Sequence, residues 1–321
     1  MCKRRGLFVA IATAAVMTAS LVHAEEWPTR PIRVIVPLSA GSALDIVPRI
    51  VFEQLSKQLG QPIIVENRPG ASGTIGGRAV AVADPDGYTL LAHSSAFVIA
   101  PSTVPNLPYD AIKDFTPVAA LGNLPNVLVV SPSKNITKIQ QLVALGKERP
   151  ITFGSIGVGS PIQLAMERLR LSAGFKAQAI SFRGAPEALV EAMTGRIDAY
   201  YSPVLPALSF IRDGKLIPLV VSSPTRSPAL PNVPTSEEAG YPNSAYRFWL
   251  GVFAPAKTPP AIVDRLSNEI GKALQMPEVQ EKLAQLGVQS MSMDSKQFGE
   301  FVKHELVINT DLAKAAGIAI P

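Results

Sequence analysis

Two short stretches of the sequence constrain the fold most, because each runs from a β-branched segment through a glycine- and serine-rich turn into a helical pattern. The first is VIVPLSAGSALD, residues 34–45, and the second is TFGSIGVGSPIQL, residues 152–164. Such a turn leaves the first backbone N–H groups of the next helix unpaired, and the aligned peptide dipoles there favour negative charge. Each stretch is therefore a candidate anion site, although an ordinary tight turn has the same composition.

Short β-branched runs alternate with amphipathic segments along the rest of the chain. Strands are expected at residues 32–37, 62–67, 89–94, 151–155, 177–182, 197–202 and 216–223. Helices are expected in the intervals and in the tail, at residues 261–286 and 298–315. This order is typical of an α/β protein with mainly parallel sheets flanked by helices. Because the pattern of strand, glycine turn and helix starts again midway, two lobes are expected.

The lobe boundaries follow from where the pattern breaks. Residues 222–242 are proline-rich and are expected to wrap over a surface, since they suit neither a regular helix nor a central strand. The helical tail that follows is expected to return to the first lobe. We therefore predict a first lobe of residues 25–124 and 253–321, and a second lobe of residues 125–252. The chain is expected to cross between the lobes near 124–130 and near 249–253.

The N-terminal segment has the composition of an export signal. Three basic residues, an apolar run and a small-residue ending at Ala24 predict a secretory signal cleaved after that residue. Cleavage would remove Cys2, the only cysteine, so no disulfide is expected. It would also lower the formal charge from +5 to +2, because the segment holds three basic and no acidic residues. A weakly basic chain with few aromatic residues gives little support to nucleic-acid binding.

Cofactor and enzyme classes find little support in the motifs. Neither turn carries the dinucleotide fingerprint or the Lys-Ser/Thr pair of a P-loop. After cleavage the remaining histidines are His93 and His304, far apart and without metal-ligand spacing, so neither metal nor cofactor is expected. A serine hydrolase would need His93 beside Ser94 or Ser95, yet adjacent strand residues point to opposite faces. A secreted hydrolase with no recognisable catalytic set stays as an alternative.

Seven stretches, in order along the chain, carry a family resemblance. They are WPTRPIRVIVPLSAGSALDIVPR, VENRPGASGTIGG, DPDGYTLL, FTPVAALG, SFRGAPEALVEAMTGRID, GKLIPLVVSSPTRSPALPNVPTSEEAGYP and FAPAKTPPAIVDRL. Together they resemble the tripartite tricarboxylate transporter receptor family, also called Bug solute-binding proteins, over nearly the whole mature chain. The resemblance implies a two-lobed periplasmic binding protein of the Venus-flytrap kind, type II. A monomer is expected, because nothing in the sequence demands a larger assembly. Such a receptor captures a small organic carboxylate and passes it to a membrane permease. A ligand-sensing module for a signalling partner is the other alternative.

The resemblance also places the ligand residues on matching positions of this chain. The two turns would hold the ligand, and a strand end, the RGA at residues 183–185 and the strand 197–202 would border it. The expected ligand-binding residues are Leu38, Ser39, Gly41, Ser42, Asp45, Ser94, Ser95, Ser155, Gly159, Ser160, Arg183 and Ser202.

The sequence leaves open the roles of Asp45 and Arg183 and the identity of the ligand. Asp45 is expected either to cap its helix or to receive a ligand amine, and Arg183 either to bind a second carboxylate or to form a surface ion pair. Leu38, Gln163 and Ser202 replace the residues usual in the family, a Phe, a His and an acidic residue. Which carboxylate is bound is therefore not fixed by the pattern.

Overall fold

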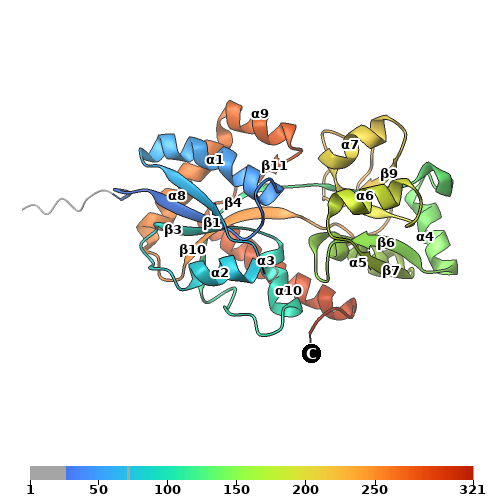
Figure 1. Ribbon diagram of the computed structural model, residues 1–321, viewed down its shortest axis with the longest axis horizontal. Helices are drawn as coiled ribbons and strands as arrows, with labels where there is room; N and C mark the ends of the chain where they lie inside the picture. Colours follow the sequence, from blue (N-terminus) through green and yellow to red (C-terminus); the bar gives the residue numbers. More distant parts are fainter. Residues whose placement is uncertain (1–26, 71–72, 321) are drawn as a thin grey trace, which may run out of the picture.

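The computed structural model describes residues 27–70 and 73–320, which form two lobes side by side (Figure 1). Both lobes contain sheets with helices on their faces, so the expected two-lobed α/β fold is confirmed. The expected signal segment, residues 1–24, lies outside the described residues. Within the described ranges, no helix has the length and apolar character needed to cross a membrane.

The first lobe is built on a six-stranded sheet in the order β11-β4-β10-β3-β1-β2. Its strands are β1 (Ile32–Val36), β2 (Ile63–Asn67), β3 (Thr89–Ser94), β4 (Phe115–Asn123), β10 (Trp249–Pro255) and β11 (Gln289–Ser290). Parallel pairing joins β1 to β2 and to β3, whereas β10 pairs antiparallel with β3 and β4. Because β4 leads the chain out of this lobe and β10 leads it back, the two strands must run in opposite directions.

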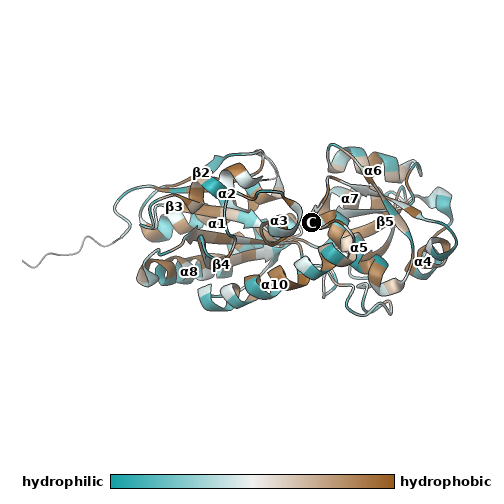
Figure 2. Cartoon of the chain, turned by 90° about the horizontal axis from the view of Figure 1, so that it is seen from below, coloured by the Kyte–Doolittle hydropathy of each residue, from teal (hydrophilic) through white to brown (hydrophobic). Residues whose placement is uncertain are grey.

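Helices cover both faces of the six-stranded sheet. They are α1 (Ala43–Leu59), α2 (Thr74–Ala81), α3 (Ala96–Thr103), α8 (Pro260–Gln275), α9 (Pro277–Gln285) and α10 (Ser295–Ala315). Apolar residues of α1, α8 and α9 form one core, and those of α2, α3 and α10 form another on the opposite face. In Figure 2, hydrophobic colour follows the strands, while the outward face of α10 is hydrophilic.

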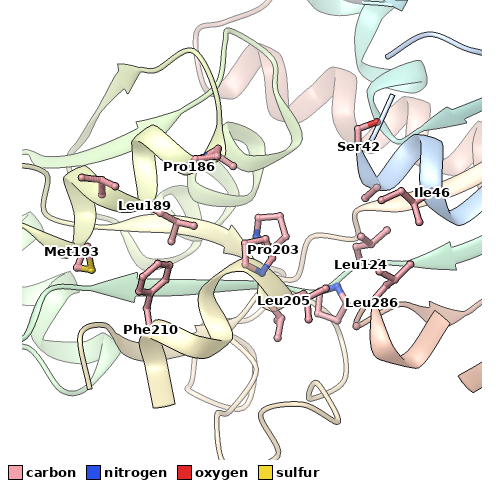
Figure 3. Close-up of a pocket in the computed structure, with 18 residues that line it drawn as sticks. Ser42, Ile46, Leu124, Pro186, Leu189, Met193, Pro203, Leu205, Phe210 and Leu286 are labelled. Atoms are coloured by element: carbon pink, nitrogen blue, oxygen red, sulfur yellow. The ribbon is translucent and has the colours of Figure 1, made fainter. Parts of the chain in front are cut away.

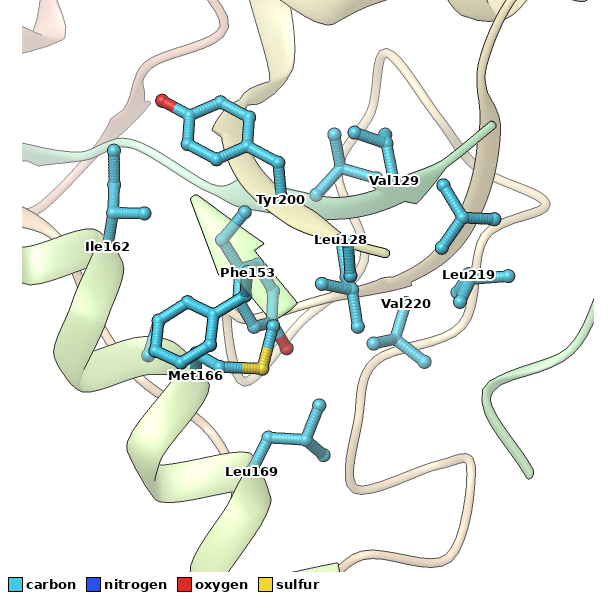
Figure 4. Packing of buried hydrophobic residues seen from close by; sticks show 14 of the residues in the cluster. Leu128, Val129, Phe153, Ile162, Met166, Leu169, Tyr200, Leu219 and Val220 are labelled. Atoms are coloured by element: carbon cyan, nitrogen blue, oxygen red, sulfur yellow. The ribbon is translucent and has the colours of Figure 1, made fainter. Parts of the chain in front are cut away.

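The second lobe holds two smaller sheets. One has the order β8-β5-β9, all antiparallel, and the other pairs β6 with β7 in parallel. Its elements are β5 (Asn126–Val130), α4 (Ile139–Glu148), β6 (Ile151–Ser155), α5 (Pro161–Ala173), β7 (Ala177–Ser181), α6 (Ala185–Met193), β8 (Tyr200–Pro203), α7 (Val204–Arg212) and β9 (Ile217–Val221). Figure 4 shows the core, in which Phe153 of β6 packs near Met166 and Leu169 of α5.

Two chain segments cross between the lobes and are hydrogen-bonded to each other. The N–H of Leu124 in one crossing donates to the carbonyl of Phe248 in the other (2.8 Å). On the second-lobe side, the N–H groups of Ser222 and Tyr246 bond to the carbonyls of Asn126 (2.8 Å) and Ser222 (2.7 Å), so Ser222 bridges the two segments there. The sheet of the first lobe includes β10 from Trp249 onward, four residues before the expected boundary at 253. The crossings therefore form a short two-stranded connection, the geometry expected of a hinge between two lobes.

The C-terminal helix α10 provides a third link between the lobes. Phe298 and Val302, in its first half, belong to a core of the first lobe, whereas Leu312, near its end, belongs to the core of the second. Beyond the helix, the N–H of Ile320 donates to the carbonyl of Ser102 in α3 (2.9 Å). Movement of one lobe against the other must therefore be accommodated along α10 as well as at the crossing strands.

Asp198 is a buried carboxylate that joins three parts of the second lobe. It accepts hydrogen bonds from the guanidinium of Arg149 (2.7 and 2.8 Å), from Lys134 (3.0 Å) and from the N–H and hydroxyl of Thr152 (2.9 and 3.0 Å). Burial alone would raise the pKa of Asp198, but the bonds from Arg149, Thr152 and Lys134 outweigh it and hold the pKa far below its usual value. The role of Asp198 in this structure is to hold the lobe together.

Replacing Asp198 with Asn tests this role. Because the change removes the charge that Arg149 and Lys134 surround, we expect a loss of about 3 kcal/mol in the free energy of unfolding at pH 7, measured by urea denaturation. A carboxylate with a lowered pKa stabilises the folded state above its unfolded pKa of about 3.9 and loses that effect as the pH falls. The difference between wild type and variant should therefore shrink below about pH 4.

Asp213→Asn is the matched control, because Asp213 forms an exposed ion pair with Lys215 (3.5 Å). Its effect should stay within about 0.5 kcal/mol at any pH. An equal loss in both variants would contradict the structural role assigned to Asp198.

Candidate ligand-binding site

A cavity of about 720 Å³ lies between the two lobes and is the main candidate for a binding site. Its first-lobe wall comes from the start of α1 and the end of α9, and its second-lobe wall from α6, the end of β8 and α7. The crossing residues Leu124 and Pro125 also line the cavity. Figure 3 shows Leu124 beside Ile46 and Leu286 on the first-lobe side. The volume falls in the range of small-molecule pockets, which often lie where two lobes meet.

Three helices begin at the wall of this cavity. Ala43 is the first residue of α1, Ala185 is the first of α6, and Leu205 is the second of α7, and all three line the cavity. Within the part of the chain that the structure describes, their backbone N–H groups have no hydrogen-bond acceptor. Helix N-termini carry partial positive charge, so this arrangement suits a compact anion.

The rest of the cavity wall is apolar. None of its eighteen lining residues has a charged side chain, and Ser42 is the one with a polar side chain. The second-lobe wall includes one face of α6, at the helical spacing of residues 185, 186, 189, 190 and 193, together with Phe210 of α7. A ligand held here would meet N–H dipoles in place of full charges, with apolar surface around the remainder of the molecule.

Ser42 is the N-cap residue of α1, yet its hydroxyl makes no capping bond. The Oγ atom is buried and without a hydrogen-bond partner among the described residues, and Figure 3 shows it at the cavity. Buried hydroxyls are normally hydrogen-bonded. Ser42 therefore lines the cavity with a hydroxyl that no described residue binds, and its role as a ligand donor stays a prediction.

Asp45 organises the turn that precedes α1. One carboxylate oxygen accepts from the N–H of Gly41 (2.9 Å), and the other accepts from Arg49 Nε (2.8 Å) and Asn67 Nδ2 (2.9 Å). Asn67 also donates to the carbonyl of Leu38 (3.0 Å), which fixes the start of the turn to the end of β2. Of the two roles left open for Asp45, this arrangement corresponds to the capping of its own turn.

The ionisation of Asp45 follows from the same contacts. Burial would raise the pKa of its carboxyl, but the bonds from Gly41, Asn67 and Arg49 together hold the pKa below its usual value. Gly41 adopts a positive φ of 82°, a conformation that favours glycine. Asp45 therefore remains charged at neutral pH and keeps the turn in a shape that presents Ser42 and Ala43 to the cavity.

In the second glycine- and serine-rich turn, which precedes α5, the polar groups hydrogen-bond mainly to one another. The hydroxyl of Ser155 donates to the carbonyl of Gly157 (2.9 Å), and the N–H of Gly159 donates to Gln163 Oε1 (2.9 Å). The hydroxyl of Ser160 accepts from the N–H of Gln163 (3.4 Å) as the N-cap. Gln163, which replaces the usual histidine, thus closes this turn at both ends.

This turn also faces the first lobe, but on the side of α3. A Cβ atom built on Gly159 would lie 2.9 Å from the side chain of Thr103, the last residue of α3. The residue has a φ of 72°, so both its conformation and the close neighbour require glycine. The turn is therefore an interlobe contact that lies outside the cavity wall.

The remaining predicted residues lie in three other places. Ser94 and Ser95 are buried at the end of β3, where the N–H of Ser95 donates to the carbonyl of Trp249 (2.9 Å). Ser202 is buried in β8 and donates to the carbonyl of Pro203 (2.9 Å). Arg183 is exposed before α6. Of the twelve predicted residues, Gly41 and Ser42 line the cavity, and ten do not: Leu38, Ser39, Asp45, Ser94, Ser95, Ser155, Gly159, Ser160, Arg183 and Ser202.

The histidine that a hydrolase would need is inaccessible. Burial lowers the pKa of His93 to about 4, and its Nδ1 accepts a hydrogen bond from the N–H of Ser94 (2.8 Å). In the described chain no hydrogen bond joins this ring to a serine hydroxyl. Tyr200 and Tyr201 are also buried in the second-lobe core, away from the cavity wall, and desolvation raises their pKa values.

The fold and the interlobe cavity define a two-lobed solute-binding protein, and known proteins specify its family. The sequence model of the tripartite tricarboxylate transporter family receptor matches residues 47–318. The chain is 36% identical to the protein BugT of Bordetella pertussis, over 94% of this chain and 92% of that one. The chain therefore belongs to the tripartite tricarboxylate transporter receptor family, as the resemblance implies.

Two solved structures similar to this chain contain ligands. An R. palustris protein solved with adipate has a TM-score of 0.80 at 29% identity, covering 91% of this chain and 99% of its own. MatC from Rhodopseudomonas palustris, solved with bound malate, has a TM-score of 0.75 at 30% identity, with coverage of 89% and 99%. The solved periplasmic binding protein BugD has a TM-score of 0.77 at 30% identity, covering 91% of this chain and 99% of its own. The family and this neighbour make the chain a periplasmic solute-binding receptor.

Asp45→Ala tests whether this carboxylate holds the first turn. The variant loses the acceptor for Gly41, Arg49 and Asn67, so we expect a decrease of about 2 kcal/mol in the free energy of unfolding, measured by urea denaturation. Glu53→Ala on the same helix is the control, because its exposed carboxylate makes surface ion pairs and its loss should cost no more than about 0.5 kcal/mol. Equal stabilities of the two variants would refute the organising role.

Proposed function

We propose that this receptor binds a small organic carboxylate in the interlobe cavity and delivers it to a membrane permease, without catalysing a reaction. The single observation that carries the proposal is the convergence of three helix N-termini, one from the first lobe and two from the second, on one cavity free of charged side chains. The adipate and malate bound to the two neighbours support a carboxylate as the ligand.

The binding energy that such a site supplies is adequate for a receptor. Hydrogen bonds to a charged group contribute roughly 1.5–3 kcal/mol each. A carboxylate accepting from the N–H groups at the starts of α1, α6 and α7, and from the hydroxyl of Ser42, would gain about 6–12 kcal/mol. Micromolar affinity corresponds to about 8 kcal/mol, so these bonds and a modest apolar contact suffice.

Closure of the lobes follows from the position of the site. A ligand that touches α1 in one lobe and α6 or α7 in the other makes both sets of contacts fully when the lobes approach. It therefore stabilises the closed arrangement by its differential contacts, and the two crossing segments and α10 allow the movement. The permease would then distinguish loaded from empty receptor by the relative position of the lobes.

The location of the protein is part of the same proposal. Residues 1–24 are expected to direct export and to be removed after Ala24, which places the mature receptor in the periplasm beside its permease. Mass spectrometry of protein recovered from the periplasm should then give a mature N-terminus at Glu25. Deletion of the gene should abolish uptake of the bound carboxylate, whereas a signalling role would change gene expression and leave uptake intact.

Ser42→Ala tests the site directly by isothermal titration calorimetry with a panel of carboxylates. The variant loses the hydroxyl that lines the cavity at the start of α1, so we expect the Kd of the tightest ligand to rise about 10- to 100-fold. Ser292→Ala is the control, since Ser292 is exposed in the first lobe away from the cavity and its change should leave the Kd within twofold. Unchanged affinity in Ser42→Ala, or binding of uncharged solutes only, would refute the proposal.

A further inference from the structure

The interlobe cavity has two unlike ends. Ser42 and the start of α1 lie at one end, while Met193 and Phe210 lie at the opposite end (Figure 3). Between them run Leu189 and Val190, on the same face of α6. Apolar side chains line both ends, since Ile46, Leu124 and Leu286 lie on the side of Ser42 (Figure 3). The near end adds the N–H groups that begin α1 and the hydroxyl of Ser42, and the side chains that line the far end are apolar alone.

The direction of α6 adds to this difference. The helix begins at Ala185 and ends at Met193. Figure 3 shows Pro186, in its first turn, nearer to Ser42 than Met193 is. A helix C-terminus carries partial negative charge, which disfavours an anion. Phe210 likewise lies in the last turn of α7, two residues before its final residue, Arg212. The far end thus lacks the N–H groups that would satisfy a second carboxylate.

We infer that this receptor selects monocarboxylates with an apolar body, and that Met193 and Phe210 form the subsite for the end of that body. The inference rests on the proposed function, because the carboxylate must first occupy the near end. A hydroxylated acid or a second carboxylate would place polar groups against Leu189, Met193 and Phe210, where no partner replaces the lost water.

Chain length is the first test, with isothermal titration calorimetry of the purified protein against propionate, butyrate, hexanoate and octanoate. Each methylene buried along α6 should tighten binding about fourfold, until the chain fills the cavity. Hexanoate and adipate form the sharpest pair, because both have six carbons and differ only in whether the far end is a methyl or a carboxylate. Hexanoate should bind at least about tenfold more tightly than adipate, and more tightly than malate.

Substitutions at the far end are the second test. Met193→Gln and Phe210→Tyr retain the size of the side chain and add a polar group. Each should raise the Kd of octanoate about tenfold while leaving the Kd of propionate within twofold. Met276→Gln is the matched control, because Met276 is exposed in the first lobe and does not line the cavity. It should change neither Kd.

Different results would contradict the apolar subsite and the carboxylate receptor. If adipate or malate binds more tightly than hexanoate, or if the far-end variants leave the chain-length dependence unchanged, the apolar subsite is wrong and the carboxylate receptor stands. If none of these carboxylates binds, the proposed function fails, and the inference falls with it.

Discussion

Unpaired backbone N–H groups at the starts of three helices are the constraint on which the rest of this structure depends. Leu205 is exposed, and Ala43 and Ala185 are half-buried, so water reaches these residues while the lobes are apart. Closure of the lobes would remove that water, and no charged side chain lines the cavity to replace it. A ligand anion satisfies the N–H groups and gains the favourable dipole of each helix. Because α1 belongs to one lobe and α6 and α7 to the other, the same interaction that binds the ligand also draws the lobes together.

The surrounding architecture serves to place these helix starts. Asp45 fixes the turn before α1 through Gly41, Arg49 and Asn67, so that Ser42 faces the cavity without acting as a cap. In the second lobe, the crossing strand continues into β5, and the carbonyl of Pro125 accepts from the N–H of Val204 (3.1 Å). The start of α7 is thereby tied to the hinge itself, which links the position of one helix terminus to the angle between the lobes.

Much of the fold is predictable from the sequence, because strands such as β1 and β6 and the glycine turns behind them have strong local signals. For the candidate site, the sequence correctly indicates the turn before α1 but not the residues of the second-lobe wall. Gly41 and Ser42 line the cavity, but the turn at Gly159 resembles them in composition and bonds to Gln163 instead. The periodicity of the sequence does not show that a side chain such as Gln163 accepts a hydrogen bond from the turn that precedes its own helix.

The helix α7 shows why the second-lobe wall is harder to predict. Its first turn contains Pro206, and Pro203 precedes it, so the segment resembles a loop. A proline is nevertheless tolerated there, because the first-turn N–H groups of a helix have no internal acceptor. The RGA at residues 183–185 correctly indicates that the start of α6 borders the cavity. Of these residues, however, Ala185 lines the cavity and Arg183 does not.

A crystal structure of the receptor with octanoate bound tests the central claim most directly. We expect a carboxylate with its oxygens about 3 Å from the N–H groups that begin α1 and from those of α6 or α7, with no arginine or lysine in contact. A carboxylate held instead by the side chain of Arg183, or by the turn at Gly159, would contradict it.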